Sequence, residues 1–377
     1  MNITINKLLD ICSVSTGKKD ANHNTDDGQY PFYTCAYKPI KSPTYSFEGE
    51  SIILPGNGAN VGLVLAYNGK FEAYQRTYVL NNFKADFRYV FHHLNKYWKA
   101  KNSNTQYGSA TNYIRMQNFV DYEIPLPPLH EQKRIADILD KGDSLRKKRK
   151  QAIDQCDDFL KSTFLHMFGD PVTNPRKWVF KEIEKILDIP LKAGAYYPKN
   201  KYTNDFNGIE MVHMSDAFYN KVKRGSLKRV DASRDEIEKY SINFNDILIA
   251  RRSLTYEGAA KPCRIPISKE TLIFESSLIR VRTNKKEILP IFFFYYINND
   301  IARTAFLLKN VTKSTISGIS QAGLNRTEIY VPPLPLQQKF ASIVEKTEAV
   351  KQKMQKQLKE LDDNFNSLMQ RAFKGEL

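Results

Sequence analysis

The sequence of 377 residues lacks several features that mark particular classes of protein. Its four cysteines, Cys12, Cys35, Cys156 and Cys263, are scattered, so we expect neither a disulfide framework nor a cysteine-based zinc site. No apolar run approaches about 18 residues, which argues against a transmembrane helix. The first residues show no basic leader and no small-residue cleavage site. We therefore expect a cytoplasmic protein that makes no contact with a membrane.

Motifs for chemistry on DNA are also absent. Amino-methyltransferases use Asn or Asp before Pro-Pro and an aromatic residue, whereas each Pro-Pro pair here precedes a leucine. No nuclease pattern of the form P-D…(D/E)-x-K is present, and the six histidines have no carboxylate at metal-ligand spacing. The pair His92-His93 is expected to lie partly exposed on a helix. The sequence thus predicts a non-catalytic chain with no cofactor and no metal.

Positive charge is abundant. Lysine and arginine number 57 against 41 acidic residues, a net charge of +16. Such an excess favours a polyanionic partner, because each neutralised phosphate releases a counterion. A basic but merely solvated surface is the alternative. The 21 tyrosines and 22 phenylalanines suit a nucleic-acid surface and a β-rich core equally well.

One glycine-rich stretch, "PGNGANVG" (Pro55–Gly62), invites a nucleotide-binding interpretation. A phosphate-cradling loop needs a helix directly after it, and the following residues instead have the pattern of a strand. A simpler interpretation is a β-turn with positive φ at Gly56 and Gly58. A third is a turn that presents Asn57 and Asn60 to DNA.

An internal repeat organises the chain. "PPLHEQKRIADIL" begins at Pro127, and its close relative "PPLPLQQKFASIV" begins at Pro332, 205 positions later. Gln132 matches Gln337 at the same spacing, and further matches on both sides extend the repeat to roughly 55 residues without a gap. The prolines precede a helical pattern, where their fixed φ and missing N–H are tolerated.

Each repeat predicts a long helix. Apolar residues recur at steps of three and four after the prolines and form a seam, which includes Leu145 and Val350 and is interrupted in the first copy by Gly142 and Arg149. A helix from Leu129 to Met167 would be about 58 Å long, too long for one small domain to bury. An antiparallel pair of the two helices is the simplest arrangement. The basic run "RKKRK" (Arg146–Lys150) could contact DNA backbone, face solvent or dock an acidic partner.

The segments before each helix have a different residue pattern, with short runs typical of strands separated by residues typical of turns. Asn68-Gly69 predicts a two-residue hairpin between the strands on either side of it. The expected strands are 51–54, 61–67, 70–74 and 77–80 in the first segment and 246–250 and 271–282 in the second. An aromatic-rich helix is expected near the end of each segment, at 87–98 and at 291–306.

This alternation resembles the specificity subunit of Type I restriction-modification enzymes. "IPLPPLHEQKRIADILDK" is similar to the central conserved region of that family and "VPPLPLQQKFASIVEK" to its C-terminal counterpart. "GQYPFYTCA" (Gly28–Ala36) with "YQRTYVL" (Tyr74–Leu80) resembles one class of its target-recognition domains. In that family each globular segment reads one half of a split DNA sequence, and the paired helices hold the halves apart.

The resemblance implies an α+β fold, with two α/β target-recognition domains separated by a pair of long antiparallel coiled-coil-like helices in a pseudo-twofold internal repeat. The expected domains are 1–126 and 171–331 for recognition, with spacer helices at 127–170 and 332–377. The implied partners are double-stranded DNA with a bipartite site and two methyltransferase subunits, which bind S-adenosylmethionine. Restriction subunits, which use ATP, are optional further partners. The alternative is a coiled-coil scaffold with basic ends that bind nucleic acid non-specifically; a fused methyltransferase is disfavoured because no catalytic domain is present.

Arg pairs bidentately with guanine and Asn or Gln with adenine, while Lys, Ser and Thr more often bind phosphates. Such residues near turns and strand edges, together with one tyrosine, are therefore the candidate DNA contacts. Thr111-Asn112 and Ile316-Ser317 occupy equivalent repeat positions, which favours those two sites. The candidates are Lys18, Lys19, Asn57, Asn60, Gln75, Arg76, Asn112 and Arg115 in the first segment, and Arg224, Arg251, Arg252, Ser253, Tyr256, Lys313, Ser314, Thr315 and Gln321 in the second.

Overall fold

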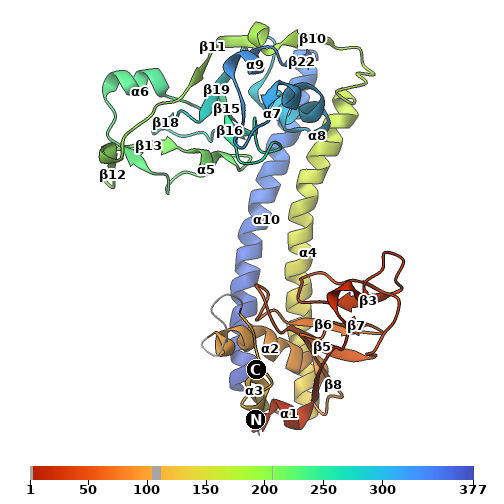
Figure 1. Cartoon of the computed structure of the whole chain (residues 1–377). Coiled ribbons are helices and arrows are strands. Elements are labelled where there is room, and N and C mark those ends of the chain that lie inside the picture. Colours follow the sequence, from red (N-terminus) through yellow and green to blue (C-terminus); the bar gives the residue numbers. More distant parts are fainter. Residues whose placement is uncertain (1–2, 104–111, 206) are drawn as a thin grey trace. The chain divides into compact units, whose positions relative to one another are not determined.

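The computed structural model describes residues 3–103, 112–205 and 207–377, and the chain divides into two compact units. Unit 1 comprises Met1–Ala152 with Met354–Leu377, and unit 2 comprises Ile153–Lys353. Each unit therefore combines a globular segment with parts of both long helices (Figure 1). The division into four segments at the helix starts remains a prediction about which parts act as modules.

The two long helices have the predicted extents. Helix α4 spans Leu129–Phe168 and α10 spans Leu334–Lys374. In unit 1, Arg146 Nε donates to Asp362 Oδ1 at 2.5 Å and Arg149 Nη1 to Gln357 Oε1 at 2.6 Å. The partner number falls as the α4 number rises, so the helices run antiparallel there.

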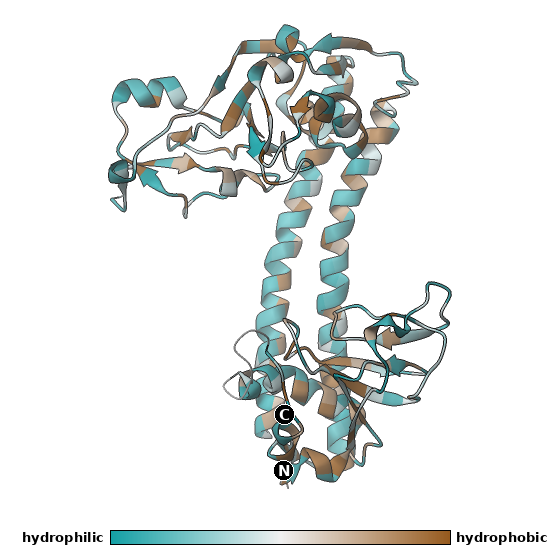
Figure 2. Cartoon of the chain, in the orientation of Figure 1, coloured by the Kyte–Doolittle hydropathy of each residue, from teal (hydrophilic) through white to brown (hydrophobic). Residues whose placement is uncertain are grey.

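In unit 2 the helices are antiparallel too. Lys351 Nζ lies 2.6 Å from Asp157 Oδ1, and the Phe164 and Phe340 rings pack at 5.6 Å between centroids. Most of the length of both helices is hydrophilic (Figure 2). Leu145 and Val350, both predicted for the seam, are 56% and 49% exposed, so the seam is narrower than the sequence pattern indicated. Among the described residues, no helix has the length and apolar character needed to cross a membrane.

Unit 1 is built on one four-stranded and one three-stranded sheet. The larger sheet has the order β2-β8-β5-β6 with antiparallel neighbours, and the smaller has the order β4-β3-β7. A two-stranded ribbon joins β1 to β9. The strands are β1 (Thr4–Lys7), β2 (Ser13–Thr16), β3 (Tyr30–Tyr33), β4 (Ile40–Ser42), β5 (Glu50–Pro55), β6 (Leu65–Asn68), β7 (Glu72–Ala73), β8 (Thr77–Asn81) and β9 (Glu123–Leu126). The helices are α1 (Leu8–Ile11), α2 (Phe87–Asn102) and α3 (Gln117–Val120), with a 3-10 turn at Ala21–His23.

Unit 2 repeats this plan with additions. Its main sheet has the order β11-β19-β15-β17, its second sheet β12-β14-β13-β18, and a small third sheet β16-β21-β20; β10 pairs with β22. The strands are β10 (Val179–Glu182), β11 (Leu187–Ala193), β12 (Tyr202–Thr203), β13 (Ile209–Val212), β14 (Arg229–Val230), β15 (Asp246–Ala250), β16 (Arg252–Ser253), β17 (Pro262–Arg264), β18 (Leu272–Phe274), β19 (Leu278–Thr283), β20 (Val311–Thr312), β21 (Ser317–Ile319) and β22 (Glu328–Val331). The helices are α5 (Met214–Ala217), α6 (Arg234–Tyr240), α7 (Pro290–Asn298), α8 (Asp300–Ala302) and α9 (Gln321–Asn325).

The internal repeat therefore extends through the globular segments. In each unit the first main-sheet strand is followed directly by a glycine, Gly17 or Gly194, whose backbone passes close to the end of another strand. A Cβ on Gly17 would lie 1.8 Å from the Ala73 carbonyl oxygen, and one on Gly194 would lie 2.1 Å from that of Phe274. The same close approach at the same step of both units requires glycine. The structure thus confirms an α+β fold made of two copies of one plan.

Several local predictions are wrong. The hairpin at Asn68-Gly69 does not form, because β6 pairs with β5 and β7 pairs in parallel with β3 in the other sheet. The expected strands 61–67 and 70–74 shrink to β6 and β7, since residues 61–64 belong to the turn that leads from β5 into β6.

In the second segment, the single strand expected at 271–282 is divided into β18 and β19, which belong to different sheets. The helix expected at 291–306 is interrupted at Asn299, whose backbone is extended and whose side chain accepts from the N–H groups of Ile301 and Ala302. That side chain ends α7 and caps a new helix, as asparagine favours.

The repeated glutamine forms an equivalent joint in each unit. Gln132 Oε1 accepts from the Asp86 N–H at 2.9 Å, and its Nε2 donates to the Pro127 carbonyl at 2.8 Å. Gln337 Oε1 accepts from the Leu289 N–H at 2.8 Å, and its Nε2 donates to Pro332 O at 2.7 Å and Glu287 O at 2.9 Å. Asp86 and Leu289 are the N-cap residues of α2 and α7. The motif thus ties the start of each long helix to the start of the aromatic-rich helix before it.

Candidate nucleic-acid interface

In unit 1 the end of β5 forms a ladder with the segment that follows the undescribed residues 104–111. Ile114 N donates to Gly56 O at 2.9 Å, and Gly58 N donates to Asn112 O at 2.8 Å. Asn57 and Tyr113 are bridge partners between these bonds. The glycine-rich stretch is therefore a turn that leads into β6, and the nucleotide-loop interpretation is wrong.

The two glycines of this turn serve different purposes. Gly58 has φ of +84°, as predicted. Gly56 does not have a positive φ, so that part of the prediction is wrong. It is needed because a Cβ would lie 2.2 Å from the Arg76 carbonyl oxygen. This close approach brings the β5 turn against the residues that precede β8.

Three candidate residues meet at this edge. Asn57, Gln75 and Arg76 line a cavity of about 360 Å³, together with Thr16, Gly56, Tyr78, Tyr113 and Ile114. Gln75 Nε2 donates to Asp20 Oδ1 at 2.7 Å, and Arg76 is exposed. Burial raises the pKa of Tyr78, so its hydroxyl stays protonated and donates to Ile114 O at 3.3 Å. An amide and a guanidinium beside tyrosine rings provide the groups that read base edges and bind phosphates.

The other unit 1 candidates surround this edge or support it. Lys18 is exposed, and Lys19 is half-buried as the bridge partner of Tyr74. Asn60 Nδ2 donates to the Cys35 carbonyl at 2.8 Å, which indicates a role in holding the turn. Arg115 Nη2 donates to the Tyr113 hydroxyl at 2.8 Å. Asn112 is exposed, whereas its neighbour Thr111 lies outside the described residues.

Unit 2 has the same ladder at the end of β15. Ile319 N donates to Arg251 O at 2.9 Å, and Arg251 N donates to Ser277 O at 2.8 Å. The corresponding bonds in unit 1 join Ile114 to Gly56 and Gly56 N to Arg76 O at 2.9 Å. Arg252 pairs with Gly318 and therefore stands where Asn57 stands in unit 1.

More candidates gather around this second ladder. Ser253 is buried and pairs with Ser317 on β21. The Tyr256 hydroxyl donates to Leu308 O at 2.7 Å, and Lys313 Nζ lies 5.6 Å from the centroid of the Tyr256 ring. Arg252, Lys313, Ser314 and Thr315 are exposed, the last three in the loop between β20 and β21.

Two other candidates of unit 2, Arg224 and Gln321, lie outside this ladder. Arg224 Nε donates to Glu210 Oε2 at 2.7 Å, and its Nη1 donates to Glu270 O at 2.8 Å. These contacts favour a role in holding its loop. Gln321 is exposed at the first residue of α9, after the N-cap Ser320.

The basic run of α4 is divided by the geometry of the helix. Arg146 and Arg149 face α10, and the Arg146 guanidinium also lies 4.5 Å from the centroid of the Phe365 ring. Lys147, Lys148 and Lys150 are exposed. The arginines therefore stabilise the helix pair, whereas the exposure of the three lysines fits all three interpretations: contact with DNA backbone, a solvated face or an acidic partner.

The histidine pair is buried, contrary to the prediction. His92 is 2% exposed and its Nε2 lies 2.7 Å from Asp140 Oδ1 of α4. His93 is 5% exposed, and burial, with a smaller contribution from Lys101, lowers its pKa to about 3. In the part of the chain that the structure describes, no group of three or more His, Cys, Asp or Glu side chains could hold a metal ion.

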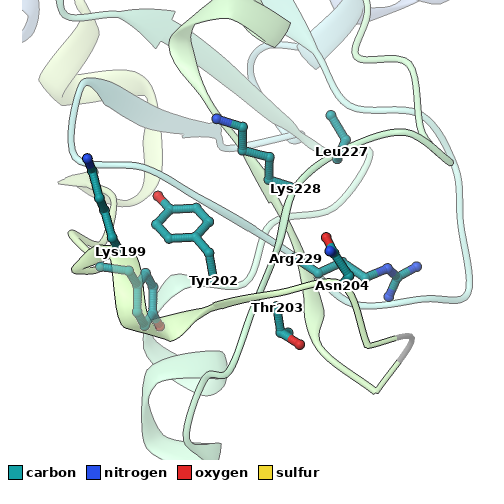
Figure 3. A pocket seen from close by; sticks show the side chains of 8 residues that line it. Lys199, Tyr202, Thr203, Asn204, Leu227, Lys228 and Arg229 are labelled. Carbon is teal, nitrogen blue, oxygen red and sulfur yellow. The ribbon is translucent and has the colours of Figure 1, made fainter.

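A cationic pocket that was not predicted from the sequence lies on the second sheet of unit 2 (Figure 3). The volume of this pocket is about 680 Å³. The hydroxyl of Tyr202, one of its lining residues, is hydrogen-bonded to His213 Nε2 at 3.0 Å. Burial, and next the Glu236 carboxylate, raise the pKa of Tyr197 to about 12. Tyrosine faces can stack on bases, and ammonium groups bind phosphates. The lining residues are Tyr197, Lys199, Tyr202, Thr203, Asn204, Leu227, Lys228 and Arg229. The sequence signal was the alternation of Tyr, Lys and Asn in "YYPKNKYTN" (Tyr196–Asn204).

Comparison with known proteins supports this architecture. The EcoDI specificity subunit of a Type I restriction enzyme from Escherichia coli is 25% identical over 415 aligned residues, which cover 98% of this chain and 88% of that protein. A solved Type I restriction-modification S subunit from M. genitalium superposes with a TM-score of 0.62 at 16% identity, covering 99% and 96% of the two chains. A chain from a study of complex assembly and conformational transition of the type I R-M system superposes at 0.56, with 14% identity and coverage of 100% and 98%.

The family model described as "Type I restriction modification DNA specificity domain" matches residues 2–155 and 175–361. The two matched ranges together account for most of the chain, and each contains one copy of the repeated sheet and ladder. The chain belongs to the Type I restriction modification DNA specificity domain family.

Proposed function

We propose that this chain is the DNA-reading subunit of a Type I restriction-modification complex. It recognises a bipartite double-stranded target, with one half-site read by each unit. It docks methyltransferase subunits, two in the simplest symmetric arrangement, and restriction subunits are optional. The chain itself is non-catalytic and acts in the cytoplasm.

One observation carries this proposal. The backbone places a side chain at the same ladder position in both units, Asn57 opposite Tyr113 and Arg252 opposite Gly318. Asparagine favours adenine and arginine favours guanine in the major groove. Two equivalent edges with different reading groups are what a split, asymmetric target requires.

Other candidates then have supporting roles in the proposal. Gln75 and Arg76 in unit 1 lie beside the reading position and would add contacts to bases or phosphates, and Arg251 and Ser253 in unit 2 precede and follow the reading position Arg252. Lys18, Lys313 and Thr315 are exposed and would bind backbone phosphates, which position the duplex without reading it. Segments 1–126 and 171–331 would act as exchangeable modules, and the antiparallel helices would set the distance between half-sites.

The alternative function is a coiled-coil scaffold whose basic ends bind nucleic acid without sequence preference. The net charge alone fits either function. Competition with random duplex at moderate salt separates them. A scaffold shows one steep salt dependence and no preferred sequence, whereas a reader retains its split target.

The direct test is single-molecule sequencing of methylated bases in a host that expresses this chain with its methyltransferase partner. Arg252→Ala should relax one position of one half-site, at a cost of about 1–3 kcal/mol in discrimination, and leave the other half-site unchanged. Arg234 is exposed on α6 of the same unit, so Arg234→Ala is the matched control. Relaxation of both half-sites by Arg252→Ala, or an equal effect of Arg234→Ala, would count against independent readers.

A further inference from the structure

Two large apolar side chains are exposed beside the reading edge of unit 2. Leu254 is 84% exposed and Ile316 is 53% exposed. They lie immediately beyond the last pair of the β16–β21 ladder, Ser253 with Ser317: Leu254 follows Ser253 in the sequence and Ile316 precedes Ser317. Scattered apolar residues on a surface are ordinary, but two that continue one ladder form a small apolar tip.

The loops that carry this tip are held by side-chain hydrogen bonds. Ser314 Oγ donates to the Ile316 carbonyl at 2.8 Å, and Ser317 Oγ donates to Ser314 O at 3.3 Å. On the other strand, Thr255 N donates to Ser253 Oγ at 3.1 Å. Both apolar side chains are therefore held in the exposed position by the local backbone.

The surroundings of the tip favour a polyanion. Arg252 precedes Leu254 by two residues and Lys313 precedes Ile316 by three, and both cations are exposed. Glu257 is the exposed carboxylate of the same turn. The tip thus combines apolar side chains with cations. This combination suits a surface that contacts a base edge while its cations face the phosphate backbones on either side.

One base edge matches this chemistry. In the major groove the 5-methyl group of thymine is the apolar group on a base edge, and that groove admits a two-stranded β-ribbon. We infer that Leu254 and Ile316 contact thymine 5-methyl groups in the half-site read by unit 2. This inference rests on the proposed function and adds a class of base to it.

Unit 1 does not share the feature. Gly58 corresponds to Ser253 of unit 2, because Gly58 lies opposite Asn112 in its ladder and Ser253 lies opposite Ser317. Ala59 therefore corresponds to Leu254, and its single methyl group is too small to form the same tip. The equivalent of Ile316 is Thr111, which lies outside the described residues.

The test replaces thymidine by deoxyuridine, which lacks only the 5-methyl group. The target is first identified from the methylation pattern, and the assembled complex with its methyltransferase partner is then titrated with duplexes at fixed salt. Deoxyuridine in the second half-site should weaken wild-type binding about four-fold for each contacted methyl group, from about 0.8 kcal/mol per buried group. The Leu254→Ala/Ile316→Ala variant should bind both duplexes equally. Ile267, 82% exposed in the same unit, provides the control Ile267→Ala, which should behave as wild type.

Each outcome has a defined meaning. Equal binding of both duplexes by wild type, a second half-site without an A·T pair, or an unchanged ratio in the double variant would overturn the inference. Loss of methyltransferase assembly in the double variant, with the ratio unchanged, would assign the tip to a protein partner instead. Absence of any preferred split sequence would refute the proposed function itself.

Discussion

The hydrogen bonds of the buried glutamine in each joint lead to a specific prediction about stability. Gln337 is fully buried and makes three hydrogen bonds, to Leu289 N, Pro332 O and Glu287 O. Gln337→Ala removes all three and leaves an N–H and two carbonyl groups without their partner. Each buried group left without a hydrogen bond costs about 1–3 kcal/mol, and water that enters the site offsets part of this cost. We therefore expect the free energy of unfolding of unit 2 to fall by about 3 kcal/mol.

The equivalent residue of unit 1 gives a graded comparison. Gln132 is 5% exposed and makes two hydrogen bonds, to Asp86 N and Pro127 O. Gln132→Ala should therefore destabilise unit 1 by about 2 kcal/mol. Gln337→Ala should cost more than Gln132→Ala because it removes three hydrogen bonds instead of two. The residue type, the position in the helix and the substitution are the same in both.

Thermal unfolding with hydrogen exchange at the Leu289 amide measures the effect. A loss of about 3 kcal/mol should lower the transition of unit 2 by about 6–12 °C. Gln338, the next residue of α10, is exposed and provides the control Gln338→Ala, with an expected change within about 0.5 kcal/mol. If Gln337→Ala and Gln338→Ala destabilise equally, the joint does not hold the helix starts together.

Two further substitutions separate bonding from packing. Gln337→Leu keeps the volume and loses the bonds, so it should remain nearly as destabilising as alanine. Gln337→Glu retains an acceptor for the Leu289 N–H but directs a carboxylate oxygen at two carbonyls. Its folded-state pKa should rise above the unfolded value, so its stability should be greatest at low pH and fall as pH rises. A Glu variant that is most stable at neutral pH would contradict the bond assignment.

Three other perturbations test the remaining features. Four residues inserted into both long helices add about one turn, near 5.4 Å, and should lengthen the DNA spacer by about one to two base pairs; an unchanged methylation spacing would refute the helix pair as a ruler. Because the pKa of buried His93 is lowered from 6.5 to about 3, the unfolded chain binds a proton that folded unit 1 does not, and stability should fall by about 2 kcal/mol between pH 7 and pH 5. His93→Phe should lack this loss in denaturant titrations at the two pH values. Lys199→Ala/Lys228→Ala should weaken binding to all sequences and reduce the slope of log K against log salt concentration by about two, whereas Lys286→Ala, at an exposed lysine of the same unit, should leave that slope unchanged.

The long helices could be predicted because their signal is local and duplicated. The Pro-Pro-Leu starts, the matched glutamines and the three- and four-residue spacing all act within one helix. The role of the glutamine could not be predicted, because its acceptor bond is to Asp86 in one unit and Leu289 in the other, far away in sequence. Arg149 was correctly placed on the seam, and its partner Gln357 came only with the fold.

The errors in the globular segments share one physical cause. Asn68-Gly69 is a sound turn signal, but a turn does not determine which strands pair on its two sides. The strands before and after it belong to different sheets, because β6 pairs with β5 and β7 pairs with β3. The burial of His92 was likewise non-local, because Asp140 lies on α4. Asn299 is the exception, since its capping tendency was readable from the sequence.

Under the proposed function, the ladder at the end of β5 and β15 would let a reader change its target without changing its fold. The hydrogen bonds that fix the position, Ile114 N to Gly56 O and Ile319 N to Arg251 O, involve backbone atoms alone. The side chain between them is free to vary because it is partly or fully exposed, as Asn57 in one unit and Arg252 in the other demonstrate. Under the proposed function, specificity would reside in side chains that contribute little to folding, while the glutamine joints and the buried aromatic residues would carry the stability. Substitution at the two ladder positions should accordingly alter sequence preference with little change in unfolding, and substitution at the joints should do the reverse.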